Sequence, residues 1–299
     1  GDPRNHYLAR MEWAENSEEL LLQQLNRLQN QNKVMMANAH SGEIKTVYTD
    51  KDKAWIEVRF GFTQWIEKGK QFTYVSEREG WRQLYLVARD GSNVRKVTIG
   101  KYDIIRTLKL DEDKGLLYFI ASPDNATERY LYRVGLDGKG LKRLSPADQT
   151  GSHSYSLSTD AKWALHTFSN IDSPPVTNLI ELPSHRVIRT MEMNQALRDK
   201  LIKLKRPKSE FFRINIDKSV AVDAYAILPP DLNPKKKYPL LVYVYGEPAG
   251  QTTVNGWRGS GGLWHWMLAQ QGYVVMSIDN RGTTAPRGNA WRKSIYRQV

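Results

Sequence analysis

The sequence predicts two kinds of fold in succession: part of a β-propeller over residues 1–192 and an α/β sheet over residues 207–299. In the first part, a unit of about 47 residues recurs four times. Each unit holds short runs rich in Val, Ile, Tyr, Phe and Trp between Gly, Asp and Asn turns. In the second part, two apolar runs flank a helical segment, a pattern typical of strands joined by a helical crossover.

Each repeat is marked by a turn followed by an alternating strand. The four marked positions are Ile44, Val94, Leu141 and Arg186, which lie 50, 47 and 45 residues apart. About four strands per repeat is the signature of a propeller blade. Because one blade cannot bury both of its faces, blades must stack around an axis. We therefore expect about four blades, roughly half of a larger propeller.

Residues 19–42 allow two interpretations. Leu21, Leu25 and Leu28 have helical spacing, whereas the repeat requires a hairpin here with QNQN as its turn. We favour the hairpin, because a helix would break the register of the first unit.

The pattern changes near residue 195. The segment NQALRDKLIKLK has helical periodicity, with Asn194 as its cap and Pro207 as its stop, so residues 193–206 should form a helical junction. Beyond the junction, FFRINI and VAVDAYAILP should pair antiparallel. YPLLVYVYG and YVVMSIDNRG should be strands buried on both faces. The helix between those two strands, GGLWHWMLAQQG, should end at Gly272.

Composition excludes several classes of site and partner. The chain has no Cys, so it offers no disulfide, thiolate nucleophile or Cys-based zinc site. No apolar run approaches the ~18 residues of a membrane helix, so no membrane span is expected. The net charge of +12 is spread along the chain, and its one short cluster, Lys235 to Lys237, lies in a proline-rich loop. No nucleic-acid partner is expected, because the sequence has no aromatic–basic surface motif. We expect neither a metal nor another cofactor, because no metal-type spacing connects the histidines, which are His6, His40, His153, His166, His185 and His265.

Three phrases in the second part resemble the prolyl oligopeptidase family of serine peptidases, most closely its dipeptidyl peptidase IV branch in a bacterial form. They are YPLLVYVYGEPAGQ (238–251), SIDNRGT (277–283) and PRGNAWRKSIYRQ (286–298). Phrases of the repeats, such as EREGWRQLYLV (77–87), fit as well, and the likeness covers essentially the whole chain. The resemblance implies an α/β-hydrolase domain capped by an eight-bladed propeller. It also implies hydrolysis of peptides that releases N-terminal dipeptides with Pro or Ala second.

The resemblance assigns roles to four residues. Tyr245, in the family's Y-x-x-P stretch, would donate its hydroxyl to the oxyanion hole, where a preorganised donor stabilises the charge that develops in acyl transfer. Gln251 would lie near the leaving-group side of the cleft. Arg59 and Phe60 fall where the branch presents an Arg–Phe pair from the propeller to the substrate.

Other residues near Tyr245 are expected to be structural. Asp279 and Arg281 resemble an opposite-charge pair that braces the loop after the second strand. Tyr243 and His265 should pack rather than take part in chemistry. Glu247 replaces the small residue that is commoner at this point of the family loop, and it should face solvent or pair with an Arg.

Ser260, in GWRGSGG, does not fit a serine nucleophile. The nucleophile elbow is G-x-S-x-G, but the residue two before Ser260 is Arg258, and the motif occurs nowhere in the chain. Ser260 should instead cap the following helix. By the resemblance, the catalytic Ser, Asp and His would lie beyond Val299, and the paired glutamates that bind the substrate amine would lie before Gly1.

The N-terminus lacks an initiator Met and a signal-peptide pattern, so we expect a processed form or a fragment. This chain alone should be inactive, and its full-length parent should be an active serine-type dipeptidyl aminopeptidase. The resemblance further implies peptide substrates with a free N-terminus, a homodimer, and a periplasmic or extracellular location.

Three alternatives stay open. One is a non-catalytic homologue that uses the same scaffold for binding. Another is a different member of the family, such as a tripeptidyl or acylaminoacyl peptidase. The third, a basic nucleic-acid binder, is disfavoured by the spread of the charge.

Overall fold

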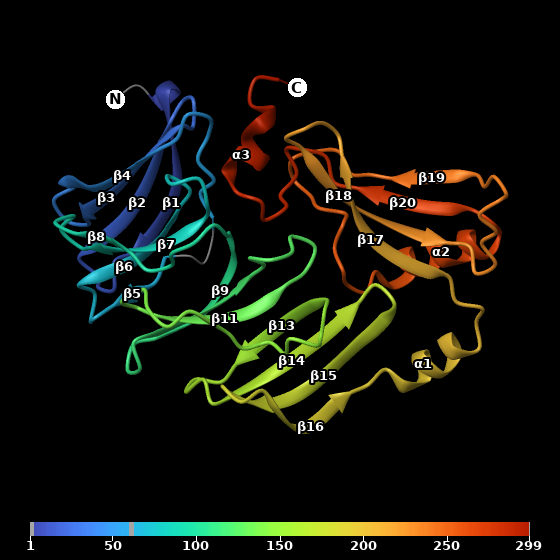
Figure 1. Cartoon of the computed structure of the whole chain (residues 1–299). Helices are drawn as coiled ribbons and strands as arrows, with labels where there is room; N and C mark the ends of the chain where they lie inside the picture. The colour runs from blue at the N-terminus through green and yellow to red at the C-terminus, as the bar shows by residue number, and fades with distance from the viewer. Residues whose placement is uncertain (1–2, 60–62, 299) are drawn as a thin grey trace. The chain divides into compact units, whose positions relative to one another are not determined.

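A computed structural model describes residues 3–59 and 63–298 of the chain. In this part of the chain, twenty strands form five four-stranded sheets, and the helices are few and short (Figure 1). No helix of the described residues combines the length and the apolar character that crossing a membrane requires.

Each of the first four sheets is built from four strands that are consecutive in the sequence and adjacent in the sheet. Where the register is defined along these sheets, the pairing is antiparallel. The strands are β1 (His6–Trp13), β2 (Glu19–Asn26), β3 (Gln31–Asn38), β4 (Ile44–Lys51), β5 (Trp65–Ile66), β6 (Gln71–Ser76), β7 (Gln83–Ala88), β8 (Val94–Lys96), β9 (Ile104–Asp111), β10 (Leu116–Ala121), β11 (Tyr130–Gly135), β12 (Lys142–Arg143), β13 (Ser152–Leu157), β14 (Trp163–Asn170), β15 (Ser173–Glu181) and β16 (Arg186–Glu192).

The fourth strand of every sheet begins at, or one residue after, the position that marks the repeat. β4, β8 and β16 begin at Ile44, Val94 and Arg186, and β12 begins one residue after Leu141. One repeat is therefore one four-stranded antiparallel sheet, the unit from which propeller blades are made.

The hairpin favoured for residues 19–42 is confirmed, but its turn lies at residues 27–30, because Gln31 and Asn32 of QNQN already belong to β3. β2 and β3 pair from Glu19 opposite Asn38 to Leu25 opposite Asn32. The side-chain oxygen of Asn26 accepts hydrogen bonds from the backbone N–H groups of Asn30 and Gln31 and so closes the turn. Strand alternation buries Leu21 and Leu25 on one face, which explains the spacing that also suited a helix.

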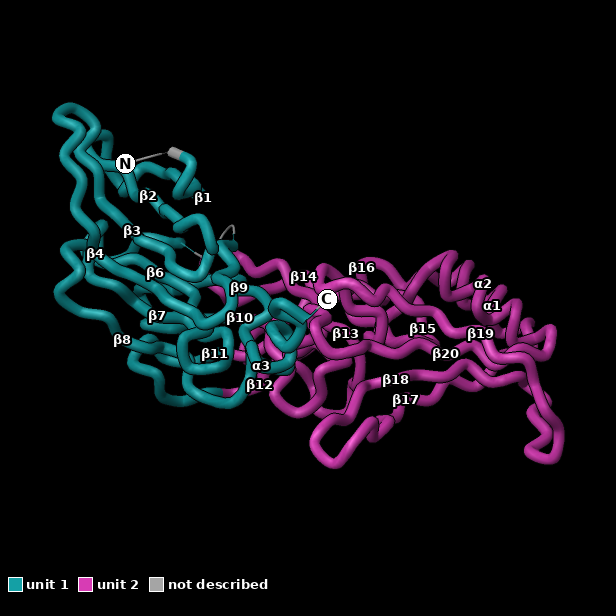
Figure 2. The backbone as a smooth tube through the Cα atoms, turned by 90° about the horizontal axis from the view of Figure 1, so that it is seen from above, with its two compact units in different colours: residues 1–118, 133–141, 287–299 teal, residues 119–132, 142–286 magenta. Residues whose placement is uncertain are grey.

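The chain divides into two compact units, coloured separately in Figure 2. The first comprises residues 1–118, 133–141 and 287–299, and the second comprises residues 119–132 and 142–286. The first unit has a core cluster formed by Ala14, Leu21, Val34, Met36, Val47, Tyr48, Phe72, Tyr74 and Val87. The second has a core cluster formed by Ile171, Leu201, Tyr225, Ile227, Trp266, Ala269 and Val275.

The fifth sheet belongs to the second unit and has the order β17-β18-β20-β19. Its strands are β17 (Lys208–Asn215), β18 (Ala221–Leu228), β19 (Leu240–Tyr243) and β20 (Val274–Ile278). β17 and β18 pair antiparallel, as expected, and so do β18 and β20. β19 and β20 are parallel and are joined by helix α2 (Gly259–Gln270), which confirms the predicted strand–helix–strand crossover.

The expectation that the last two strands are buried on both faces is wrong. β19 lies at the edge of its sheet, and Leu240 and Val242 are 55% and 46% exposed. β20 lies inside the sheet but alternates between buried and half-buried residues. An apolar run indicates which side chains favour burial, but the order of strands decides whether they find a cover.

The helix ends differ from the prediction at two caps. Asn194 precedes α1 (Gln195–Ile202), but its backbone is left-handed with φ 54°, and its side chain makes no capping bond. It donates instead to the carbonyl oxygen of Pro175 at 2.9 Å. α2 begins at Gly259, where φ is +57°, so Ser260 lies inside the first turn and does not cap it.

The C-terminal end of α2 is as predicted. Gly272 follows the helix with φ +91°, and its N–H donates to the carbonyl oxygen of Ala269 at 3.0 Å. This left-handed glycine is the usual helix stop. The short helical elements that complete the fold are η1 (Pro3–Asn5), α3 (Asn289–Arg292) and η2 (Lys293–Ile295).

Candidate functional site

Tyr245 follows the carboxyl end of β19, and its side chain is 51% exposed. The chain turns at Gly246, where φ is +81°, and returns so that Gly250 lies against the Tyr245 ring. Functional groups in α/β proteins gather at the carboxyl ends of parallel strands, where the loops leave the sheet. Tyr245 thus lies at such a strand end, exposed enough for a ligand to reach. Glu247, in the same loop, is exposed, as expected.

Gln251 is held by three hydrogen bonds. Its side-chain oxygen accepts from Nη2 of Arg129 at 2.5 Å. Its side-chain nitrogen donates to the carbonyl oxygens of Ala126 and Thr253, each at 3.0 Å. All of these groups belong to the second unit. Gln251 is therefore a fixed point of the loop that follows Tyr245.

Arg129 is a partly buried cation. Its Nη1 donates to the carbonyl oxygens of Ala126 and Glu128, at 2.9 and 2.7 Å. Burial lowers the pKa of its guanidinium to about 10, and the charge of Asp279 opposes that shift in part. Arg129 is therefore still protonated at neutral pH. Within the described residues, its hydrogen-bond acceptors are uncharged oxygens.

Asp279 braces the loop, but through a partner that differs from the expected one. Its carboxylate accepts from the N–H groups of Thr252 and Thr253, at 2.8 and 3.0 Å, and from the Thr252 hydroxyl at 2.9 Å. The pKa of Asp217 is lowered chiefly by hydrogen bonds from Ser219, and the charge of Arg281, the expected partner of Asp279, adds to that effect. The pairing prediction failed because loop backbone N–H groups, which no sequence pattern displays, occupy the carboxylate.

Tyr243 and His265 pack against each other. Their rings meet edge to face with centroids 5.2 Å apart, and the guanidinium of Arg258 lies 5.3 Å from the Tyr243 ring centre. His265 is buried, and burial, helped by the charge of Arg258, lowers its pKa. The two rings thus pack against each other, and Tyr243 remains 38% exposed.

Arg59 lies in the first unit, in the segment between β4 and β5. Its Nε and Nη2 donate to one carboxylate oxygen of Glu57, at 3.1 and 2.8 Å. The same oxygen accepts from Nη2 of the buried Arg82 at 3.0 Å. Arg59 lines a pocket of the first unit together with Glu57, Arg82 and Lys293. Phe60, its predicted partner, lies outside the described residues.

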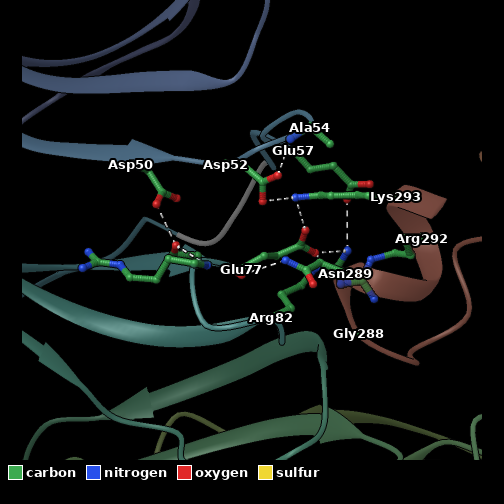
Figure 3. A network of polar contacts seen from close by, with 12 residues as sticks. Asp50, Asp52, Ala54, Glu57, Glu77, Arg82, Gly288, Asn289, Arg292 and Lys293 are labelled. Atoms are coloured by element: carbon green, nitrogen blue, oxygen red, sulfur yellow. Dashed lines mark hydrogen bonds and ion pairs between the residues drawn. The ribbon is translucent and has the colours of Figure 1, made fainter. Parts of the chain in front are cut away.

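A network of buried charges continues from this pocket (Figure 3). Arg292 connects two carboxylates: its Nη2 lies 2.5 Å from Glu77, and its Nη1 lies 2.5 Å from Asp103. Lys293 connects Asp52 and Glu77, at 2.5 and 2.9 Å. All these residues belong to the first unit, because residues 287–299 are part of it.

Two carboxyl groups that face this pocket, Glu77 and Asp50, have pKa values shifted in opposite directions. Burial raises the pKa of Glu77, but the charges of Arg292, Arg82 and Lys293 outweigh it and hold the pKa at about 2. Asp50, which faces the same pocket, has a weaker set of partners. Burial raises its pKa to about 6 despite a hydrogen bond from Ser76 at 2.9 Å.

Three histidines of the second unit form a cluster that the sequence did not predict. Nδ1 of His153 and Nε2 of His166 are 2.9 Å apart, and the rings of His166 and His185 have centroids 4.6 Å apart. The register of β13 against β14, in which His166 lies opposite Tyr155, brings His153 and His166 together, and His185 joins them from the turn between β15 and β16. In the described part of the chain, no group of three or more His, Asp and Glu residues has a geometry that could hold a metal ion.

Comparison with known proteins identifies relatives along the chain. Residues 1–175 match the family model described as the dipeptidyl peptidase IV (DPP IV) N-terminal region. The probable dipeptidyl peptidase 4 of Arthroderma benhamiae is 26% identical over 279 residues, which cover 92% of this chain and 36% of the relative. The dipeptidyl peptidase 4 of Trichophyton rubrum gives the same values.

Two solved bacterial structures share the fold. Porphyromonas gingivalis dipeptidyl peptidase 4 superposes with a TM-score of 0.88 at 28% identity and covers 98% of this chain and 41% of its own. A putative dipeptidyl aminopeptidase IV from Bacteroides ovatus gives a TM-score of 0.84 at 24% identity, covering 100% of this chain and 44% of its own.

The chain spans a little over a third of the length of the curated relatives that it matches. The family match covers more than half of the chain and spans the first three four-stranded sheets and part of the fourth. On these grounds the chain belongs to the family of dipeptidyl peptidase IV N-terminal regions.

Proposed function

We propose that this chain is part of a serine exopeptidase that hydrolyses peptides and releases N-terminal dipeptides with Pro or Ala second. In this proposal residues 1–192 are propeller blades, residues 193–206 a helical junction, and residues 207–299 the first part of an α/β-hydrolase domain. The observation that carries it is the half-exposed Tyr245 at the carboxyl end of a parallel strand, in a chain whose relatives are dipeptidyl peptidases.

The proposed chemistry at Tyr245 is electrostatic. Attack on a peptide carbonyl builds negative charge on its oxygen, and a donor already in place stabilises that charge by about 2.7–4 kcal/mol. The Tyr245 hydroxyl would be such a donor. The nucleophile, its base and the orienting acid would come from residues outside this chain.

Gln251, Arg59 and Phe60 are proposed to contact the substrate. Because both N–H donors of Gln251 are taken by carbonyl oxygens, its proposed contact with the leaving group would use the second lone pair of its side-chain oxygen. The proposed substrates are peptides with a free N-terminus. A homodimer and a periplasmic or extracellular location are part of the same proposal and rest on the family alone.

The test uses the full-length protein that contains this chain. A Gly-Pro chromogenic amide should be hydrolysed, and an N-terminally acetylated analogue should not. Tyr245→Phe should lower kcat by about 10²–10³-fold, because only the donor hydroxyl is removed. The isolated 299-residue chain should not hydrolyse either substrate.

The matched control is Tyr243→Phe, two residues earlier on the same strand. The Tyr243 ring packs against His265, and phenylalanine keeps that contact, so activity should stay within about twofold. Stable binding of Gly-Pro peptides without turnover would favour the non-catalytic alternative. Release of tripeptides or acylated residues would favour another member of the family.

A further inference from the structure

The Tyr245 ring rests on the backbone of Gly250. A Cβ built on Gly250 would lie 2.8 Å from Cδ1, 3.1 Å from Cε1 and 3.2 Å from Cγ of Tyr245. Carbon atoms that are not bonded approach no closer than about 3.5 Å without strain. Any side chain at position 250 would therefore push the ring away.

Glycine is required at position 250 because a Cβ atom would overlap the Tyr245 ring, not because the backbone conformation there favours glycine. Gly246, in the same loop, has a positive φ, but Gly250 is not among the residues with positive φ. An alanine at position 250 would thus fit the backbone, and its methyl group would meet only the Tyr245 ring within 3.2 Å.

The segment that carries Gly250 is anchored at Gly250 itself and at the three residues that follow it. The Gly250 carbonyl oxygen accepts from the N–H of Thr284 at 3.3 Å. The next residue, Gln251, is held by Arg129 and two carbonyl oxygens, and the N–H groups of Thr252 and Thr253 are held by Asp279. Gly250 is therefore a fixed surface, unlike the exposed residues 246–249.

We infer that Gly250 is the positioning residue of the oxyanion tyrosine: it seats the Tyr245 ring on a segment that Arg129 and Asp279 hold in place. A half-exposed tyrosine would otherwise sample several rotamers, and the hydroxyl would have to be ordered during the reaction. A seated ring removes that cost before the substrate arrives. This inference rests on the proposed role of Tyr245.

The test is Gly250→Ala in the full-length protein. The displaced ring should lower kcat by about 10- to 100-fold, as small misplacements of catalytic groups do, and should leave KM within about twofold. The midpoint of thermal unfolding should stay unchanged. The matched control is Gly261→Ala, because Gly261 has no atom within 4 Å of its built Cβ and needs no positive φ.

The same substitution in a Tyr245→Phe background separates positioning from general damage. Without the hydroxyl, moving the ring should cost nothing more, so the double variant should match Tyr245→Phe alone. Equal losses from Gly250→Ala in both backgrounds would overturn the inference, and so would full activity of the single variant. If Tyr245→Phe itself were fully active, the proposed oxyanion role would fail instead.

Discussion

At the scale of single residues, the first unit depends on charges that are buried but paired. The Arg292 side chain is 2% exposed and touches Glu77 and Asp103, which are 9% and 0% exposed. Removing such charges from water costs several kcal/mol per ion, which their mutual attraction and hydrogen bonds offset. Loss of one partner leaves that cost uncompensated.

Arg292→Met should therefore destabilise the protein by about 3–5 kcal/mol, because the buried Asp103 loses its cation and Glu77 keeps only Arg82 and Lys293. The measurement is a denaturant titration followed by a probe in residues 287–299. Arg186→Met is the matched control, since Arg186 pairs with Glu181 at 3.0 Å on the surface and is 65% exposed. That variant should lose no more than about 1 kcal/mol. Similar losses in both variants would contradict this account.

At the scale of elements, the hairpin of β13 and β14 carries a buried, uncharged hydrogen-bond chain. Nε2 of His153 donates to the carbonyl oxygen of Gln149 at 2.9 Å, so its Nδ1 accepts from Nε2 of His166. Burial, with smaller effects of His185 and the nearby Arg143, lowers the pKa of His153 to about 4. Burial and the other two histidines lower the pKa of His166 to about 3. The hairpin is therefore stable only while these rings are neutral.

Because of these lowered pKa values, the hairpin should become less stable as the pH is lowered. In the unfolded chain histidine takes up a proton near pH 6.5, whereas the folded chain resists protonation until about pH 4. Below pH 6.5 the unfolded state binds more protons than the folded state does, so the free energy of unfolding decreases as the pH is lowered. At pH 5 the loss is on the order of 2 kcal/mol for each of the two buried histidines.

His166→Gln should remove about half of this loss. The glutamine side-chain nitrogen can replace Nε2 as donor to His153, but it cannot take up a proton. The free energy of unfolding, measured at pH 7.5 and pH 5.0, should change less in the variant than in the parent. His40→Gln, at an exposed position, serves as control. An unchanged pH dependence in His166→Gln would refute the role of the cluster.

The sequence predicted those elements whose structure depends on neighbouring residues, and it failed for those that depend on contacts between distant residues. The hairpin of β2 and β3 and the stop at Gly272 follow from alternation and from one left-handed glycine, both visible in the sequence. The exposure of β19 follows from strand order, a property of the whole sheet. Tyr245 is a site prediction made from its motif. Its contact with Gly250 could not be predicted, because it depends on how the loop after Tyr245 folds back onto the ring.

At the scale of the whole molecule, moderate acidification should change the stability of the two units in opposite directions. The second unit holds the neutral histidine cluster and loses stability as pH falls below 6.5. The first unit holds Glu77, whose lowered pKa gives stability that is lost only between about pH 4.5 and 2. It also holds Asp50, whose pKa is raised to about 6, so its folded form takes up a proton first. Between pH 6 and 3.8 this uptake adds stability to the first unit.

Acidification from pH 7 to pH 4.5 should therefore open the second unit before the first. Hydrogen–deuterium exchange of the full-length protein, corrected for intrinsic rates, should show earlier loss of protection in β13 and β14 than in β6 and β7. Asp50→Asn should reduce the difference between the pH values at which the two units lose protection, because the amide cannot gain a proton on acidification. Simultaneous loss in both units, or earlier loss in β6 and β7, would show that these buried groups do not govern acid stability.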